Sequence, residues 1–364
     1  MAVEADGVPA VAVHTHVFAR LARNAARVNG TPTLRQAFVP QPVVGVSPQQ
    51  LRAYVDGIDP VSKRPFIHAV IEGLTGPFTE ADLTGVSFER NTPRLLEPAT
   101  EAELHERFER ERWTDYMPIV LPTEERVAAM LAGTSRRPDE IVGRLRPTNY
   151  REFWEFSVEK VAVNAVMAGA RPEYFPVILA LAASGMTARQ SSTTSWSAPT
   201  IVNGPIRQQI GLNSGIGAMG PYSHANVTIG RAYALLSQNL QGGSVVGDTY
   251  MGSIGNAYNY ACVWAENEER SPWEPLHVQH GYQPEDSTVT VFLGGWYTIS
   301  GYGPRHTWEQ RFRHCLAACE PYSPPTVLPD PSVARGFVDR GFAKQQQLIA
   351  CLAAHAQVPA REYW

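Results

Sequence analysis

The sequence predicts an α/β protein made of Rossmann-like parallel sheet units flanked by helices. Three observations support this class. Apolar runs of strand length alternate with segments of helical spacing along the chain. The first three segments follow the order strand, helix, strand, which is the unit of a parallel sheet. Glycine or proline residues stand at the junctions between segments.

The chain has 364 residues, more than one ordinary hydrophobic core holds, so we expect two domains. The first domain, residues 1–120, is expected to be an α/β part with an insertion around residues 55–110, where apolar residues show no sustained period. The second, residues 121–364, is expected to be a larger α/β domain, because the character of the sequence changes at Pro122.

In the first domain the valine-rich composition of the opening run indicates a buried strand, and Pro40 ends the second strand because proline cannot donate to a ladder. A later run, EAELHERFERER, is charged enough to be a solvated helix. The expected elements are a strand over residues 8–14, a helix over 17–28, a strand over 34–39, a helix that starts at Ser47-Pro48, and the charged helix over 101–112.

The larger domain is expected to alternate helices and strands. Its buried helical stripes recur every three or four residues, as in Ile229, Ala232, Tyr233 and Leu236. The expected elements are helices over residues 122–131, 158–168, 174–183 and 226–239, strands over 206–212, 258–264 and 287–296, and helices over 306–319 and 332–355, the last broken near Gly341.

Composition and charge exclude several classes of function. A net charge of −4 spread along the chain gives no reason to expect nucleic acid or an anionic membrane surface. No apolar run reaches the roughly 20 residues that span a bilayer, and acids stand at the N-terminus where a signal peptide carries Lys or Arg. We therefore expect a cytoplasmic protein.

The four cysteines are too few and too unevenly spaced for a disulfide scaffold. Cys315 and Cys319 fall on one face of an expected helix, where two small buried side chains or a metal pair would fit. Cys351 lies in an apolar helical stretch and is read as core. Cys262 lies among the polar residues of the segment 203–292, either as a buried structural residue or as a nucleophile whose pKa a nearby base lowers.

Residues 203–292, here called the polar centre, carry more amides, histidines and glycines than a packed core needs. Glycines allow positive φ and let a ligand approach the backbone, so we expect a functional site here. The candidate substrate-binding residues are Asn203, Asn213, Ser214, Gly215, Gly217, Asn226, Arg231, Asp248 and Tyr258.

The run from Gly215 to Gly220 spells the glycine fingerprint of dinucleotide sites. That interpretation needs a preceding apolar strand, whereas Arg207, Gln208 and Gln209 stand there. A loop whose backbone amides and following helix bind an anion fits better, and His224 and Arg231 favour the same charge. We predict no cofactor.

Glu266 and Glu268 follow an apolar run and would point to one side of a strand. Paired carboxylates can separate their pKa values and act as acid and base; alternatively they bind a cation or lie in water at a strand end. A metal site is the weaker hypothesis, because the histidine spacing is unspecific. Its candidate ligands are His14, His16, His277 and His280.

Several segments together resemble the bacterial UGSC-type (seleno)protein family: GVPAVAVHTHVFARLARNAARVNGTPTLR, LPTEERVAAMLAGT, VEKVAVNAVMAGARPEYFPVILA, NGPIRQQIGLNSGIGAMGP, AENEERSPWEPLHVQHGY and GFAKQQQLIACLAAHAQVPA. The family's Sec/Cys-Gly-Ser-Cys motif precedes the first strand, and the seven residues before that strand here contain no cysteine. The resemblance implies either that another chain supplies the first strand unit and its thiols, or that the polar centre acts alone. An uncovered sheet edge favours a partner or self-association.

The expected function is an enzyme, or the larger subunit of a hetero-oligomeric one, that acts on a small polar or anionic organic substrate. With a small thiol-bearing subunit the reaction would be a reduction or a carbon–heteroatom cleavage. Alternatives are a cofactor-free lyase, hydratase or cyclase, and a non-catalytic partner of a redox protein. Among the catalytic candidates Glu266 or Glu268 is the base, His224 the acid or oxyanion donor, and Cys262 a nucleophile.

Overall fold

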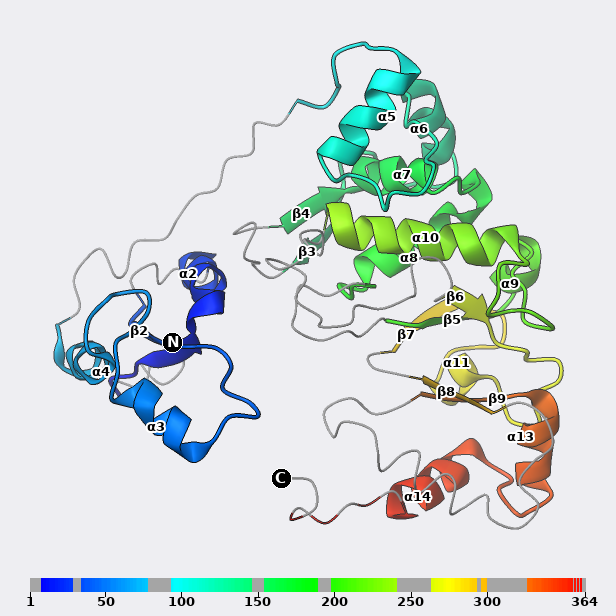
Figure 1. Ribbon diagram of the computed structural model, residues 1–364. Coiled ribbons are helices and arrows are strands. Elements are labelled where there is room, and N and C mark those ends of the chain that lie inside the picture. Colours follow the sequence, from blue (N-terminus) through cyan, green and yellow to red (C-terminus); the bar gives the residue numbers. More distant parts are fainter. Residues whose placement is uncertain are drawn as a thin grey trace. The chain divides into compact units, whose positions relative to one another are not determined.

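The computed structural model describes residues 8–28, 34–77, 93–145, 154–188, 198–240, 263–292, 296–299 and 326–355, with residues 357, 359 and 361. These residues form helices and small sheets, so the predicted mixed α/β class is confirmed (Figure 1). They divide into two compact units. Unit 1 holds the described residues up to 99 and parts of 144–155, and unit 2 holds the remainder.

Unit 1 contains the predicted strand–helix–strand segment. Strand β1 (Ala12–Thr15) pairs in parallel with β2 (Gln36–Val39), in a register that sets Ala12 opposite Gln36. Between them a 3₁₀ turn, η1 (His16–Phe18), leads into α2 (Ala19–Val28). The parallel pairing follows from the crossover helix, which returns the chain to the same end of the sheet.

Two further helices complete unit 1. Helix α3 (Pro48–Val55) begins as the sequence predicts, because the Ser47 hydroxyl accepts the backbone N–H of Gln50 at 3.2 Å. Helix α4 (Phe66–Thr75) lies in the region without a clear sequence pattern. Its Phe66 packs with Ala37 and Val39 of β2 in one buried cluster. Tertiary packing therefore orders this helix, which local sequence did not predict.

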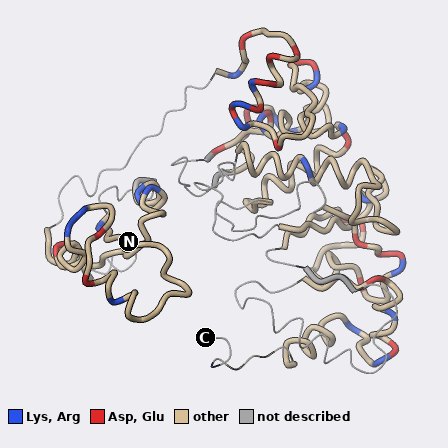
Figure 2. Tube along the Cα trace, in the orientation of Figure 1, with Lys and Arg blue, Asp and Glu red and all other residues tan. Residues whose placement is uncertain are grey.

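In unit 2, each of four helices starts at a hydroxyl side chain that caps it: Thr100, Thr123, Ser157 and Ser223. The helices are α5 (Glu101–Arg110), α6 (Glu124–Leu131), α7 (Val158–Met167) and α10 (His224–Asn239). Figure 2 shows acidic and basic residues interleaved on α5, as expected for a solvated helix. Helix α7 packs against α6, α10 and α8 (Phe175–Ala183), the last preceded by the 3₁₀ turn η3 (Pro172–Tyr174).

Two more sheets are described, and the second of them positions the site. Strands β3 (Ile141–Leu145) and β4 (Trp154–Ser157) pair with each other. The second sheet has three strands in the order β6 (Val263–Ala265), β5 (Thr200–Asn203) and β7 (Thr288–Val291). Strand β6 is parallel to β5, and β7 is antiparallel. Helices α8 and α10 pack against this sheet, and Figure 1 shows the short helix α11 (Leu276–Gln279) on the side away from α10.

The prediction of a strand over residues 206–212 is wrong. Residues Ile206–Gln209 form a short helix, α9, and the strand is β5, immediately before it. Gly204 has a φ of +83° and Pro205 follows it, so the strand ends there and the chain turns into a helix. A Cβ on Gly204 would lie 2.0 Å from the carbonyl oxygen of Asp286, so only glycine fits this turn.

The C-terminal part of unit 2 confirms the predicted broken helix. Strands β8 (Trp296–Ile299) and β9 (Thr326–Pro329) pair in parallel, and α13 (Pro331–Val338) and α14 (Gln345–His355) follow. Gly341, with a φ of +100°, separates the two helices. They enclose a cluster of buried residues that includes Trp273 and Phe337. The helix predicted over 306–319, with Cys315 and Cys319, lies outside the described residues.

Across the described ranges, no helix combines the length and the apolar character that crossing a membrane requires.

Candidate functional site

The site lies where β5 and β6 end. Because the two strands are parallel, their carboxyl ends meet at the same edge of the sheet. Asn203 is the last residue of β5, and Glu266 directly follows β6. The backbone N–H of Glu266 donates to the carbonyl of Val202 at 3.1 Å, which extends the ladder by one bond. Two residues far apart in the sequence are thus fixed side by side.

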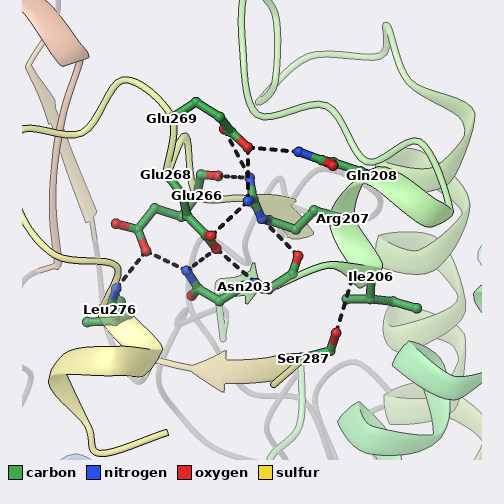
Figure 3. Close-up of polar contacts among 10 residues, drawn as sticks. Asn203, Ile206, Arg207, Gln208, Glu266, Glu268, Glu269, Leu276 and Ser287 are labelled. Atoms are coloured by element: carbon green, nitrogen blue, oxygen red, sulfur yellow. Dashed lines mark hydrogen bonds and ion pairs between the residues drawn. The ribbon is translucent and has the colours of Figure 1, made fainter. Parts of the chain in front are cut away.

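One amide nitrogen holds both predicted carboxylates (Figure 3). The Nδ2 of Asn203 donates to Glu266 Oε2 at 2.5 Å and to Glu268 Oε1 at 2.9 Å. The backbone N–H of Gly204 donates to the same Glu268 oxygen at 2.8 Å. The predicted pair is therefore brought together, but not by strand alternation, since both glutamates lie beyond the end of β6.

Arg207 of α9 is the cation of the site. Its Nη2 lies 2.8 Å from Glu268 Oε2 and 3.1 Å from Glu269 Oε1. Its Nη1 donates to the backbone carbonyl of Glu266 at 2.9 Å, and its Nε donates to the carbonyl of Gly204 at 3.1 Å. Sequence reasoning missed this arginine as a site residue, because the segment around it was read as a strand. Its position four residues after Asn203 carries no recognisable signal.

The two paired glutamates differ in their surroundings. Glu268 faces the guanidinium of Arg207, whereas Glu266 receives only N–H groups, from Asn203 and from the backbone of Leu276 at 2.9 Å. Both donors meet Oε2, and Figure 3 shows the other oxygen of Glu266, Oε1, without a dashed contact. Burial raises the pKa of Glu266 above its ordinary value; the two N–H donors oppose that rise and the nearby charge of Glu268 adds to it.

Glu269 completes the cluster at its exposed edge. It accepts from Arg207 Nη1 at 3.3 Å and Nη2 at 3.1 Å, and from Gln208 Nε2 at 3.0 Å. The hydrogen bonds from Arg207 lower the pKa of Glu269. Arg207 is therefore shared between Glu268 and Glu269, and none of the described hydrogen bonds or ion pairs brings a cation to the Glu266 carboxylate.

The predicted asparagines of the glycine loop organise the loop itself. Asn226 accepts the backbone N–H of Asn213 at 2.9 Å and donates to the carbonyls of Asn213 and Ala218, each at 3.0 Å. Asn213 in turn accepts the N–H of Gly215 at 2.8 Å and donates to the carbonyl of Ile216 at 3.0 Å. Ser214 lies half-buried in the same loop. These amides close residues 213–223 into a tight loop before α10, and Asn226 holds that loop from the first turn of the helix.

The other glycines of the fingerprint make room for an aromatic ring. A Cβ built on Gly217 or Gly220 would lie 2.7 or 2.8 Å from the ring of Tyr222. Gly217 also has a φ of +76°, a conformation that favours glycine. The ring of Tyr222 thus supplies a structural reason for two of the three fingerprint glycines.

His224 and Arg231 lie on α10 but not against the glutamates. The exposed His224 has its Nδ1 3.4 Å from the hydroxyl of Tyr174. Arg231 forms a buried bidentate pair with Asp115, at 3.0 and 2.9 Å, and also donates to the carbonyl of Met117. In the described structure no hydrogen bond or ion pair joins either residue to Glu266 or Glu268.

Asp248, Tyr258 and Cys262 lie outside the described residues. His14, whose pKa burial lowers, and His16 belong to unit 1, and His277 and His280 belong to unit 2. Within the described ranges, no three His, Cys, Asp or Glu side chains lie close enough together to hold a metal ion.

Comparison with known proteins gives one match. Residues 1–65 match the family model of the UGSC family, which confirms the resemblance over the N-terminal part of the chain. The matched residues contain β1, α2, β2 and α3, and they do not include the carboxylate site. No curated protein and no solved structure matches the chain.

Proposed function

We propose that this protein is an enzyme, or the larger subunit of one, that acts on a small polar organic substrate by general acid–base catalysis. Glu266 is the group that moves the proton. The chemistry that fits is a cofactor-free lyase, hydratase or cyclase reaction, in which a positioned carboxyl group takes a proton from the substrate or gives one to it.

The observation that carries this proposal is that two carboxylates held by one amide differ in their charge partners. Asn203 contacts both, but only Glu268 has Arg207 as a counter-charge, at 2.8 Å. The charge of Glu268 thus has a partner within the fold, while burial raises the pKa of Glu266 toward the range where proton transfer is efficient. Two neighbouring carboxyl groups with different environments are the usual basis for dividing acid and base roles.

The contacts of Glu266 also suit the transfer itself. Its two N–H donors, from Asn203 and Leu276, both engage Oε2. They hold the carboxyl group in place and stabilise its charge when the proton leaves. The proton is then carried by Oε1, which accepts no hydrogen bond from the described residues. A substrate proton placed at hydrogen-bonding distance from Oε1 is accepted there, and it returns by the reverse path.

The roles first expected for His224, Arg231 and Cys262 do not enter this mechanism, and a thiol-bearing small subunit remains a prediction from the family resemblance. The proposal therefore rests on Glu266, supported by Asn203. If such a subunit exists, its thiols would act next to the same carboxyl group.

The test is solvent exchange. Wild-type protein is incubated in D₂O with a panel of small alcohols, amides and amino compounds. ¹H NMR follows the loss of substrate C–H signals by exchange for deuterium and the formation of products. With a substrate so identified, Glu266→Gln is expected to lower turnover by about 10²–10⁴-fold, the usual contribution of a general acid or base. Glu269→Gln, which changes the exposed member of the same cluster, should retain most of it. Full turnover in Glu266→Gln would rule out the role of this residue.

A further inference from the structure

Buried polar atoms without a hydrogen-bond partner lie around the carboxyl group of Glu266. In native proteins such atoms are nearly always satisfied, so a group of them marks a place that a ligand or water fills. Among the described residues the atoms concerned are Asn203 Oδ1, both ring nitrogens of His277, and Thr288 Oγ1. Asn203 and His277 are almost completely buried, so bulk solvent does not supply their partners.

The strand register places two of these residues on one face of the sheet. Asn203 of β5 is directly opposite Thr288 of β7, and opposite residues of an antiparallel pair project to the same side. His277 joins them through α11. It follows Leu276, whose N–H donates to the Glu266 oxygen that Asn203 also contacts. Asn203 therefore contacts the proposed proton-transfer group directly, His277 acts on its charge, and Thr288 lies beside Asn203 on the same face of the sheet.

The charges around this group decide what it accepts. Arg207 is already shared by Glu268 and Glu269, and Arg231 by Asp115. Hence both buried arginines are compensated, and none of the described hydrogen bonds or ion pairs joins Arg or Lys to the Glu266 carboxylate. A carboxylate or phosphate placed here would face the Glu266 carboxylate with no arginine or lysine bound to it, and like charges at short range repel strongly. A group with N–H or O–H donors meets no such penalty.

We propose that Asn203, Thr288 and His277 form a substrate subsite that binds a neutral or cationic hydrogen-bond donor, namely a hydroxyl, amide or primary ammonium group. Below it is called the donor subsite. It deepens the proposed function and rests on it, because it narrows the substrate to compounds that present such a group beside Glu266. The expected anionic substrate group is replaced by a donor group at this position.

Each subsite atom has a defined task. Asn203 Oδ1 accepts from the ligand, since its Nδ2 is already used by the two glutamates. The Thr288 hydroxyl donates or accepts as the ligand requires. An imidazole ring presents one hydrogen-bond donor and one acceptor. His277 therefore donates to a hydroxyl or amide group of the ligand and accepts from it. The ligand group is thereby held next to Glu266 Oε1.

The chain offers a matched control on the opposite face of the same strand. Thr200 is also buried, and its hydroxyl also has no partner among the described residues. It lies three positions from Asn203 along β5, so its side chain projects to the other side of the sheet. Thr200→Val removes the same chemical group from the same strand without touching the donor subsite.

The experiment uses three probes of matched size: ethylene glycol, ethanolamine and glycolate. Each is titrated into the full-length protein, and binding is followed by the melting temperature and by the ring ¹⁵N signals of histidine. The His277 signals are identified by their loss in His277→Gln. Ethylene glycol and ethanolamine should shift these signals and stabilise the fold, and glycolate should bind at least about tenfold more weakly.

Thr288→Val, which keeps the side-chain volume, should weaken the binding of ethylene glycol and ethanolamine by about fivefold to tenfold, the effect of one lost hydrogen bond. Thr200→Val should leave their binding unchanged. Three results would each overturn the subsite. Glycolate could bind as tightly as the donor probes, or the two valine variants could lose equal binding affinity for those probes. The third result is that none of the three probes shifts the His277 signals. If His277→Gln does not fold, the melting temperatures of the valine variants still decide.

The outcome is separable from that of the proposed function. Glu266→Gln keeps the shape of the site, so it should still bind the donor probes even though it loses turnover. Retained turnover in Glu266→Gln with intact probe binding would remove the catalytic role and leave the subsite. Loss of turnover in Glu266→Gln, together with no binding of the probes to the wild type, would keep the catalytic role and remove the subsite.

Discussion

The guanidinium of Arg207 and the carboxylate of Glu268 lie 2.8 Å apart, and their side chains are only 6% and 13% exposed. This ion pair makes the two glutamates on Asn203 different from each other. The negative charge of Glu268 is compensated by Arg207, whereas none of the described ion pairs brings an arginine or lysine to the Glu266 carboxylate. Burial is the largest influence on Glu266 and raises its pKa. The chemistry proposed for the site follows from that difference.

Replacing the cation should destabilise the fold. Arg207→Met leaves Glu268 buried without its counter-charge, and breaking a buried pair in this way costs about 3–5 kcal/mol of unfolding free energy. Urea denaturation of the wild type and of Arg207→Met measures this loss of unfolding free energy. Arg137→Met is the matched control, since Arg137 and its partner Asp139 are 78% and 75% exposed, and it should leave stability unchanged. Equal effects at both positions would contradict the importance of the buried pair.

Glu266 should make stability fall with rising pH. Its pKa in the folded protein is above the ordinary 4.5, so the folded state holds a proton that the unfolded state has released. The resulting stabilisation is fully present below the unfolded pKa and is lost as pH rises through the folded pKa. The wild type should therefore lose unfolding free energy relative to Glu266→Gln between pH 4.5 and the folded pKa. Urea denaturation of both proteins at a series of pH values tests this; an opposite slope would show that the pKa is lowered.

Asn203→Asp should disrupt the site although the two side chains have nearly the same size. The change replaces a donor to two carboxylates by a third carboxylate, which leaves like charges in contact in a buried position. We expect a loss of about 3 kcal/mol or more at neutral pH. Part of that loss should be recovered on acidification, as the added group becomes protonated.

The control for Asn203→Asp is Asn267→Asp. It adds the same charge between the two glutamates in the sequence, but the Asn267 side chain makes no hydrogen bond with the described residues. Its effect should be within about 1 kcal/mol. Thermal denaturation at pH 5 and pH 7 compares the two, and a pH-independent loss in Asn203→Asp would argue against charge repulsion as its cause.

Asn226 should hold the glycine loop closed. Asn226→Ala removes the side chain that accepts from Asn213 and donates to two loop carbonyls, so we expect a loss of about 2–4 kcal/mol. Residues 213–223 should also exchange their amide hydrogens faster. Ser214→Ala, in the same loop, should change neither property. Hydrogen exchange followed by mass spectrometry measures both variants, and unchanged exchange in Asn226→Ala would mean that other contacts hold the loop.

Much of the fold could be predicted because its signals are local. Helices α6, α7, α10 and α13 begin at capping residues and carry regular apolar stripes, and a strand, helix and strand at the N-terminus predict their own parallel pairing. Helix α4 was missed because packing against β2 orders it, rather than a pattern of its own. Strand β5 was missed because it is only four residues long and buried throughout, so it shows no alternation.

The candidate site was likewise predictable only where its signals are local. By itself the sequence determined which segment is rich in functional groups and that Glu266 and Glu268 form a pair of interest. Only the tertiary structure decided that Asn203 joins them and that Arg207 compensates one of them, through contacts between residues about 60 positions apart. Capping and periodicity depend on neighbours in the chain, and the sequence displays them directly. Burial and charge compensation depend on which segments meet in space, so the acid–base character of Glu266 emerges only when β5 and β6 lie side by side.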